Sequence, residues 1–204
     1  MKRYCAKPSI ESGQRKQASH TSPLGTTMSD FRPLKRINYF SSRQLTAEDF
    51  QVEQQYSLER FRRHNRFFHG FGVVYGLRVY RKGAIIRIEP GLALDCLGNE
   101  IVVDEVVSLE LPSDLPGSSN IYVCVKYSEK GCHGLVVDQN VESASMVEES
   151  FEWALLPANP QRNHLRKNSR WLTCGRFHEF AIARIRRNSS GWGLDRRFRA
   201  PLVK

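Results

Sequence analysis

Two histidines beside a Phe-Phe pair are the first side chains in the sequence that could bind a metal ion. They are His64 and His69. Histidines that share a metal on a helix are normally three or four residues apart, because that spacing puts both rings on one face. A spacing of five turns the second ring by about 140° in an α-helix. We therefore expect the rings on different faces, in a hydrogen-bond network with Asn65, and no metal site.

A second candidate cluster contains Cys124, Cys132 and His133. Its spacing fits neither a zinc finger nor a zinc ribbon. Cys124 also lies in an apolar run at 121–125, where a buried thiol is common. The cysteines of the chain are scattered, odd in number and without Cys-x-x-Cys spacing: Cys5, Cys96, Cys124, Cys132 and Cys174. This usage predicts no disulfide framework and favours a reducing compartment.

The sequence contains no motif that indicates acid–base or nucleophilic catalysis. Asp95, Asp104 and Glu105 could be proposed as a carboxylate pair, but they lie beside expected turns, where acids commonly face water. The sequence has no Gly-x-Ser-x-Gly elbow, phosphate-binding loop or dinucleotide fingerprint. We predict a protein that is not an enzyme, with no catalytic residues, no cofactor and no metal.

One long helix is predicted at 47–68, near the N-terminal end of the patterned sequence. Thr46 suits its N-cap, and Asp49 is placed to complete a capping box. Leu45 and Phe50 occupy the positions of a hydrophobic staple, and glycines follow the helix. Three independent start signals therefore agree.

The predicted helix carries two apolar stripes. The first consists of Phe50, Phe61, Phe68 and, at its edge, Leu58. The second consists of Val52, Tyr56 and Phe67. Two stripes predict two contacts. One contact is with the chain's own β-domain. The other is with a further part of that domain or with a neighbouring subunit, and the second stripe is our candidate interaction surface.

From Gly72 onward the apolar pattern changes to a period of two, which is typical of strands. Strands are expected at 73–80, 84–88, 92–95, 100–109, 121–127, 134–138, 151–156 and 178–186. Loops are expected at 139–150 and 157–173. Closely spaced turn signals predict a mainly β (α+β) fold, in which the helix precedes an antiparallel β-sandwich or barrel-like domain.

The positive charge is concentrated at the two ends of the chain. Residues 1–37 hold eight lysines and arginines against two acids, residues 161–204 hold twelve against two, and the middle is acidic. Residues 1–33 contain few large apolar side chains, so we expect a disordered basic extension; Met28 is an alternative start to Met1. The remaining divisions are a helix plus β-rich domain at 34–187 and a basic C-terminal arm at 188–204. The chain shows neither the apolar run of a signal peptide nor a stretch of transmembrane length, which favours the cytoplasm.

Arginines near two aromatic residues mark the basic C-terminal end. The arginines are Arg184, Arg186, Arg187, Arg196, Arg197 and Arg199, and the aromatic residues are Trp192 and Phe198. Such a segment can follow a single-stranded nucleic acid or lie along an acidic protein surface. Both alternatives remain open at this point.

Several ordered blocks between residues 36 and 103 resemble an uncharacterised family associated with phage-tail-like contractile injection systems. The blocks are INYF at 37–40, QLTAEDF at 44–50, EQ at 53–54, RRHNR at 62–66, HGFGVVYGL at 69–77, PGLALD at 90–95, Gly98 and EIVV at 100–103. The block at 69–77 is similar to the family signature HGWGVVCGL. Phe71 replaces its Trp and Tyr75 replaces its frequent Cys, so no reactive role of that Cys carries over.

The resemblance implies a structural or adaptor subunit of a contractile, tail-like particle, at its baseplate, cap or anchoring end. Its partners would be baseplate, tube or sheath neighbours or further copies of the chain, and its location the cytoplasm or the assembled particle. We expect the basic C-terminal segment to pack on a neighbouring subunit. A nucleic-acid-binding protein is the alternative, and a particle-bound hydrolase is a third hypothesis.

Overall fold

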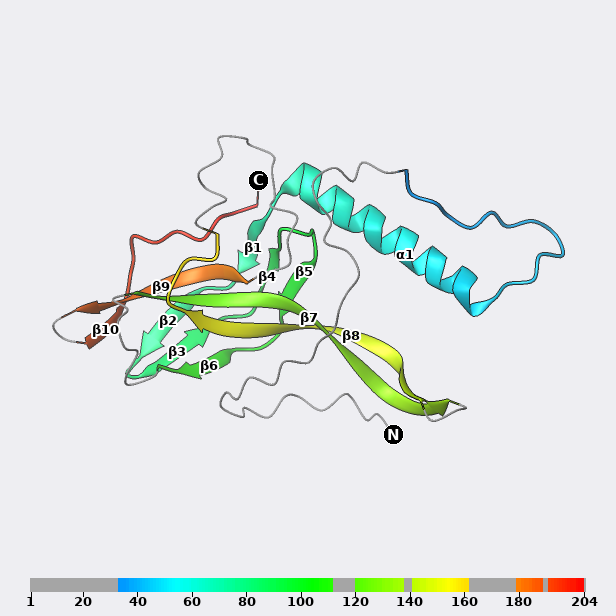
Figure 1. Ribbon diagram of the computed structural model, residues 1–204. Coiled ribbons are helices and arrows are strands. Elements are labelled where there is room, and N and C mark those ends of the chain that lie inside the picture. Colours follow the sequence, from blue (N-terminus) through cyan, green and yellow to red (C-terminus); the bar gives the residue numbers. More distant parts are fainter. Residues whose placement is uncertain (1–32, 112–119, 138–140, 162–178, 189–190, 204) are drawn as a thin grey trace.

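The computed structural model describes residues 33–111, 120–137, 141–161, 179–188 and 191–203 (Figure 1). The predicted extension at 1–33 therefore lies almost wholly outside the described residues, as does most of the predicted loop at 157–173. The helical elements are α1 (Ala47–His64) and the π-helical turn η1 (Asn65–His69). The described strands are β1 (Gly72–Gly76), β2 (Val79–Lys82), β3 (Ile85–Ile88), β4 (Gly91–Leu94), β5 (Glu100–Val103), β6 (Val107–Glu110), β7 (Asn120–Val137), β8 (Val141–Leu156), β9 (Phe180–Asn188) and β10 (Gly191–Leu194).

The strands form three antiparallel sheets. Their orders are β1-β4-β5, β2-β3-β6 and β10-β9-β7-β8. The long β7 and β8 run across the short strands of the other two sheets (Figure 1). A mainly β fold with one α-helix is confirmed in the described part of the chain, whereas closure into a sandwich or barrel stays a prediction.

The hydrophobic core lies between these sheets. Alternate residues of β3 and β5 are buried, which matches the period of two read from the sequence. The largest fully buried apolar side chains are Phe180, Ile86, Ile88, Ile101, Leu109, Ile121 and Ile185. Phe180 meets Phe71 edge to face, with ring centroids 6.3 Å apart. Phe71, two residues after η1, is thereby joined to the core of the β-domain.

Helix α1 begins where the sequence predicts. The Thr46 side chain accepts a hydrogen bond from the Asp49 amide, and the Asp49 carboxylate accepts one from the Thr46 amide. This is the predicted capping box. None of the residues of α1 is buried, and the helix extends away from the sheets (Figure 1). No helix in the described ranges is both long and apolar enough to span a membrane.

The C-terminal end of α1 is attached to the turn between β4 and β5. Asn65 Nδ2 donates to the Gly98 carbonyl oxygen at 2.9 Å. A Cβ at Gly98 would lie 2.2 Å from the Arg62 carbonyl oxygen, so the turn and the helix backbone are in direct contact. Arg62 also reaches Glu129 of β7 at 3.5 Å. These contacts set the direction in which the helix leaves the β-domain.

Two predicted strands are each divided in two. The segment 73–80 contains β1 and β2, separated where Gly76 and Leu77 have positive φ angles of 65° and 54°. Such angles break an extended strand. The segment 100–109 contains β5 and β6, separated by exposed residues at 104–106. The alternation of apolar residues continues across both breaks. The sequence pattern therefore could not show where one strand ends and the next begins.

The prediction of a loop at 139–150 is wrong, because residues from Val141 onward belong to β8. The predicted strand at 121–127 and the described part of the one at 134–138 both belong to the single strand β7. Beyond the core, β7 and β8 form a projecting hairpin (Figure 1). In this hairpin, backbone pairing between β7 and β8 defines the strand, and such pairing does not require an apolar alternation in the sequence. This is why its sequence resembles a loop.

The C-terminal segment packs on its own chain. β10, which is not among the predicted strands, pairs with β9. The Val73 amide donates to the Pro201 carbonyl at 2.8 Å, and the Val203 amide donates to the Val73 carbonyl at 3.1 Å. The backbone of this segment is therefore anchored within the chain, and its side chains remain for any neighbour. The domain limits at 33 and 187 stay predictions.

Candidate assembly surfaces

The two histidines lie together, contrary to the sequence prediction. His64 Nε2 and His69 Nε2 are 3.2 Å apart, and the ring centroids are 5.1 Å apart. The cause is η1, in which the Gly70 amide bonds to the Asn65 carbonyl at 2.9 Å. A π-turn has more residues per turn than an α-helix, so a spacing of five brings the rings back to one side. The Asn65 side chain bonds to the β-domain instead of joining a histidine network.

The cysteine cluster does not assemble into a metal site in the described part of the chain. Cys124 is fully buried in β7, and burial raises the pKa of its thiol to about 12. It is therefore protonated and unreactive at neutral pH. Cys132 is disulfide-bonded, which goes against the inference that the cysteines remain reduced. The His133 side chain lies outside what the structure describes.

The three acids considered for catalysis have different surroundings. Asp95 is buried, whereas Asp104 and Glu105 are exposed. The Asp95 carboxylate accepts hydrogen bonds from the Leu97 amide at 2.8 Å and from the Asn99 amide at 2.9 Å. The Asn99 side chain donates a third at 2.7 Å. Asp95 therefore holds the turn that contacts α1, and the prediction that it faces water is wrong. Within the described ranges no group of three His, Cys, Asp or Glu side chains could hold a metal ion.

The first apolar stripe of α1 and η1 is exposed. The exposed fractions are 58% for Phe50, 69% for Phe61, 69% for Phe68 and 39% for Leu58. Single exposed apolar residues are ordinary, but a continuous apolar stripe commonly marks a binding surface. We call these four residues the phenylalanine stripe.

The predicted interaction stripe is less exposed than the phenylalanine stripe. Val52 is 41% exposed, and Tyr56 and Phe67 are half-buried. The segment that leads into the helix is held to it, because Arg43 binds Asp49 at 2.7 Å. The assignment of this second stripe as an interaction surface stays a prediction.

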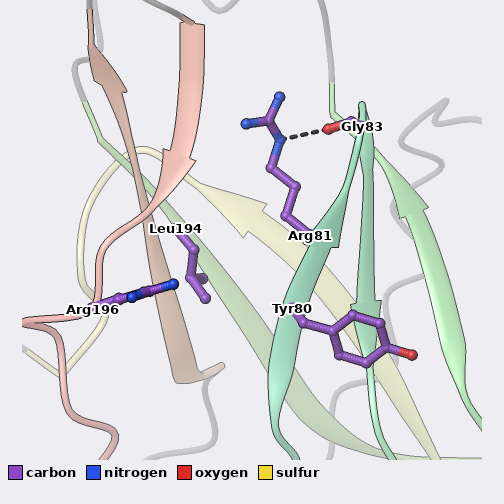
Figure 2. Close-up of a pocket in the computed structure, with 5 residues that line it drawn as sticks. All are labelled: Tyr80, Arg81, Gly83, Leu194 and Arg196. Atoms are coloured by element: carbon purple, nitrogen blue, oxygen red, sulfur yellow. Dashed lines mark hydrogen bonds between the residues drawn. The ribbon is translucent and has the colours of Figure 1, made fainter.

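The basic C-terminal residues form an open groove beside β2. Its two adjoining parts, of about 600 and 350 Å³, share Leu194 and Arg196. Arg81 lies on the β2 side and Arg196 on the β10 side (Figure 2). Arg81 Nε is bonded to the Gly83 carbonyl at 2.5 Å, which holds its guanidinium at the rim. Arg186, Arg187 and Arg197 line the second part.

These arginines do not all have the same role. Arg184 binds Asp195 at 2.6 Å and lies over the Phe198 ring, so it stabilises the fold. Arg187 lies over the Trp192 ring, with 5.8 Å from its guanidinium carbon to the ring centroid. The Arg186 side chain is 57% exposed and reaches Asp195 only at 4.0 Å. The groove therefore has excess positive charge beside an acid that is already paired.

Two further predicted residues, Arg197 and Arg199, are exposed. Arg199 bonds to main-chain carbonyl groups of its own segment, those of Arg196 and Phe198. The Arg197 main-chain amide donates to Asp195 at 2.9 Å. The Arg197 residue also lines the groove. Of the six predicted arginines, Arg186, Arg187, Arg196 and Arg197 line the groove.

Type VI secretion baseplate proteins are among the solved structures similar to this chain. A baseplate complex chain has a TM-score of 0.49 and 15% identity, and the match covers 84% of this chain and 42% of that one. A TssK-TssF-TssG baseplate subcomplex chain has a TM-score of 0.49 and 14% identity, covering 83% and 62%. TssK itself has a TM-score of 0.46 and 11% identity, covering 83% and 42%.

The chain thus spans about half the length of these structural neighbours. No protein-family profile matches the chain, and no curated protein matches it.

Asp195 provides a test of how the groove is held together. Hydrogen bonding from the Arg197 amide and the nearby Arg184 lower the pKa of the Asp195 carboxyl below 3.8. A lowered pKa stabilises the fold above the unfolded-state value, and this contribution is lost as pH falls through the folded-state value. We expect Asp195→Asn to reduce the melting temperature at pH 7.

The difference between wild type and Asp195→Asn should shrink as pH falls below 3.8. Thermal unfolding followed by circular dichroism from neutral to acidic pH measures both chains. A difference that stays constant across this range would show that the ionised carboxylate does not support the groove.

Sequence reasoning did not identify the phenylalanine stripe as the exposed one, and it did not place Arg81 beside the C-terminal arginines. The helical periodicity did show both apolar stripes, but it did not show which of them is exposed. The position of Arg81 depends on the contact between β10 and β2, two strands that are far apart in the sequence. No local pattern reports such a contact.

Proposed function

We propose that this protein is a structural or adaptor subunit of a phage-tail-like contractile injection particle, at its baseplate, cap or anchoring end. It acts through protein–protein contacts and is not an enzyme. Its partners are neighbouring subunits of the particle, and it works in the cytoplasm or within the assembled particle. The one observation that carries the proposal is the projecting helix α1, which has no buried residue and exposes the phenylalanine stripe.

A helix of this length gains most of its stability from packing its apolar face against something else. Within the described residues, the contacts of α1 with the β-domain are at its C-terminal end. An assembly subunit has a use for such a helix, because a neighbour supplies the missing packing surface.

The sequence resemblance coincides with this part of the molecule. The blocks at 44–50, 53–54 and 62–66 lie on α1 or at its ends, and the block at 69–77 leads into β1. The block at 90–95 and Gly98 belong to β4 and to the turn that contacts α1. Two blocks lie elsewhere, at 37–40 before the helix and at 100–103 in β5. Most of the resembling blocks nevertheless belong to the helix or to its attachment, which supports a role for the helix in the family.

The basic groove supports a second contact, with an acidic partner surface. The C-terminal backbone is fixed on the β-domain, so its arginines would act from a rigid support and not from a free arm. Deleting 188–204 would also remove β10 and the pairing with Val73, so loss of incorporation after that deletion would be ambiguous. Charge reversal is the cleaner test.

The proposal is tested by purifying the tagged protein from its native cells and identifying what accompanies it. Negative-stain microscopy should show sheathed rods or baseplate-like particles, and mass spectrometry should identify sheath, tube or baseplate proteins. A protein that purifies alone under gentle conditions, or with nucleic acid, would contradict the assembly role.

Reversing two groove charges should separate the protein partner from the nucleic-acid alternative. In Arg186→Glu with Arg187→Glu, we expect co-purified particle proteins to fall by about tenfold or more, because like charges then face the acidic surface. The matched control is Lys35→Glu with Arg36→Glu, two exposed cations in the segment before α1. It changes the net charge equally and should have little effect.

The nucleic-acid alternative predicts a different result. Purified wild type would bind DNA or RNA with a steep salt dependence, and the groove variant would lose this binding. Equal losses in the groove variant and in the control would instead indicate that only net charge matters, and the groove would not be a specific docking site.

A further inference from the structure

The three phenylalanines of the phenylalanine stripe lie on a heptad face, with Leu58 beside it. With alternating steps of three and four, this face of α1 contains Ala47, Phe50, Gln54, Ser57, Phe61 and His64. This is the spacing with which two helices pack along a shared seam. Phe68 of η1 continues the face, because its ring stacks on the His64 ring with centroids 4.8 Å apart. Large aromatic side chains lie toward both ends of the seam, and the small or polar Gln54 and Ser57 lie at its middle.

The charges of the helix are arranged by position along its length. The N-terminal half carries Glu48, Asp49 and Glu53, of which Asp49 is already paired with Arg43. The C-terminal half carries Glu59 and a larger number of arginines: Arg60, Arg62, Arg63 and Arg66. A second copy aligned antiparallel would place each acidic half beside a basic half. A second copy aligned parallel would place like charges together, which is unfavourable. The helix is therefore electrostatically complementary to itself in one orientation.

We propose that two copies of this protein associate through α1, with the two helices antiparallel and related by a twofold axis near Gln54 and Ser57. Phe50 of each copy then lies opposite Phe61 of the other, so both aromatic side chains lose water contact. Glu53 of each copy lies beside Arg60 of the other. The contact is self-complementary and closed, which limits it to two copies.

Three of the four side chains at this contact, those of Phe50, Phe61 and Arg60, are exposed. Glu53 is half-buried, with its Oε2 atom buried and its Oε1 atom left for the ion pair. Arg62, in contrast, is engaged by Glu59 at 3.9 Å and by Glu129 at 3.5 Å. We therefore assign the intermolecular ion pair to Arg60. This inference goes beyond the proposed function because it concerns the isolated chain and needs no other component of the particle.

The mass of the purified full-length chain in solution tests the pairing. Sedimentation velocity or light scattering after gel filtration should give the mass of a dimer. The fraction of dimer should rise as the protein concentration increases. Phe61→Asp should weaken association by about a hundredfold, because a charged group would enter the seam. Tyr75→Asp is the matched control, since Tyr75 is an aromatic residue that is 76% exposed and belongs to β1 instead of α1. It should leave the mass unchanged, with far-ultraviolet circular dichroism confirming the fold of both variants.

Charge exchange tests the orientation. Glu53→Arg alone and Arg60→Glu alone should each weaken association, and the double variant should restore it. A monomeric wild type, a mass of three or more chains, or a Phe61→Asp variant that still dimerises would overturn the proposal. A double variant that fails to recover would overturn the antiparallel alignment. None of these outcomes decides whether the protein belongs to a particle, which the co-purification experiment tests separately.

Discussion

Replacing Gly98 with alanine should lower the free energy of unfolding by about 2–5 kcal/mol. Gly98 has a φ of 86°, a conformation that disfavours a side chain. The added Cβ would also lie 2.2 Å from the Arg62 carbonyl oxygen and 2.9 Å from its carbonyl carbon. Both are backbone atoms, so the clash is relieved only if the helix end or the turn moves. Chemical denaturation followed by tryptophan fluorescence measures the loss.

Gly83→Ala separates the two causes. Gly83 also has a positive φ, 65°, but no atom lies within 4 Å of a Cβ placed there. This variant should show only the backbone strain, about 1–2 kcal/mol. The excess loss in Gly98→Ala then reports the contact with α1. Equal losses in the two variants would mean that the turn does not support the helix.

Replacing Asp95 with alanine should lower the free energy of unfolding by about 3 kcal/mol. Asp95 is 3% exposed and accepts the Leu97 amide, the Asn99 amide and the Asn99 side-chain amide. Alanine would leave buried N–H donors without acceptors. The free-energy cost of an unsatisfied buried donor is larger than the net stabilisation that one hydrogen bond provides. Urea unfolding measures the change. Asp104→Ala is the control: this acid comes from the same stretch but is exposed, and its variant should be nearly neutral.

The pH dependence gives Asp95 an independent signature. Burial raises the pKa of the Asp95 carboxyl above 3.8, and the hydrogen bonds from Asn99 and Leu97 oppose this rise only in part. The folded state then holds its proton more tightly than the unfolded state does. Stability due to this group therefore falls as pH rises from the unfolded pKa through the folded pKa. Asp95→Asn should lack that decline, and an identical pH profile for wild type and variant would contradict the assignment.

These two residues also illustrate what sequence patterns can and cannot show. The sequence placed Asp95 beside a turn, and Gly98 lies between the strands expected at 92–95 and 100–109. Neither pattern revealed that the turn contacts the end of a helix more than thirty residues earlier. A turn signal reports local backbone geometry, whereas the partner of a turn depends on how distant elements pack.

The start of α1 was predictable because its signals are local. The capping box of Thr46 and Asp49 is made by residues three apart, and the structure contains both of its hydrogen bonds. The end of the helix was less predictable. A π-turn at 65–69 brought His64 and His69 together, although ordinary helical spacing separates them. One additional residue in a helical turn shifts the directions of the side chains that follow it away from those of a regular α-helix.

The sequence by itself determined that the chain is mainly β with one amphipathic helix, and that its positive charge lies toward its ends. These properties follow from hydrophobic periodicity, helix capping and composition, which can be recognised in short segments of the sequence. Only the tertiary structure decided that the phenylalanine stripe faces outward and that Arg184 is committed to Asp195 while Arg81 joins Arg196 at a groove. An apolar period shows that a helix has a face to cover. Which surface covers it is set by long-range packing, and that information is spread over the whole chain.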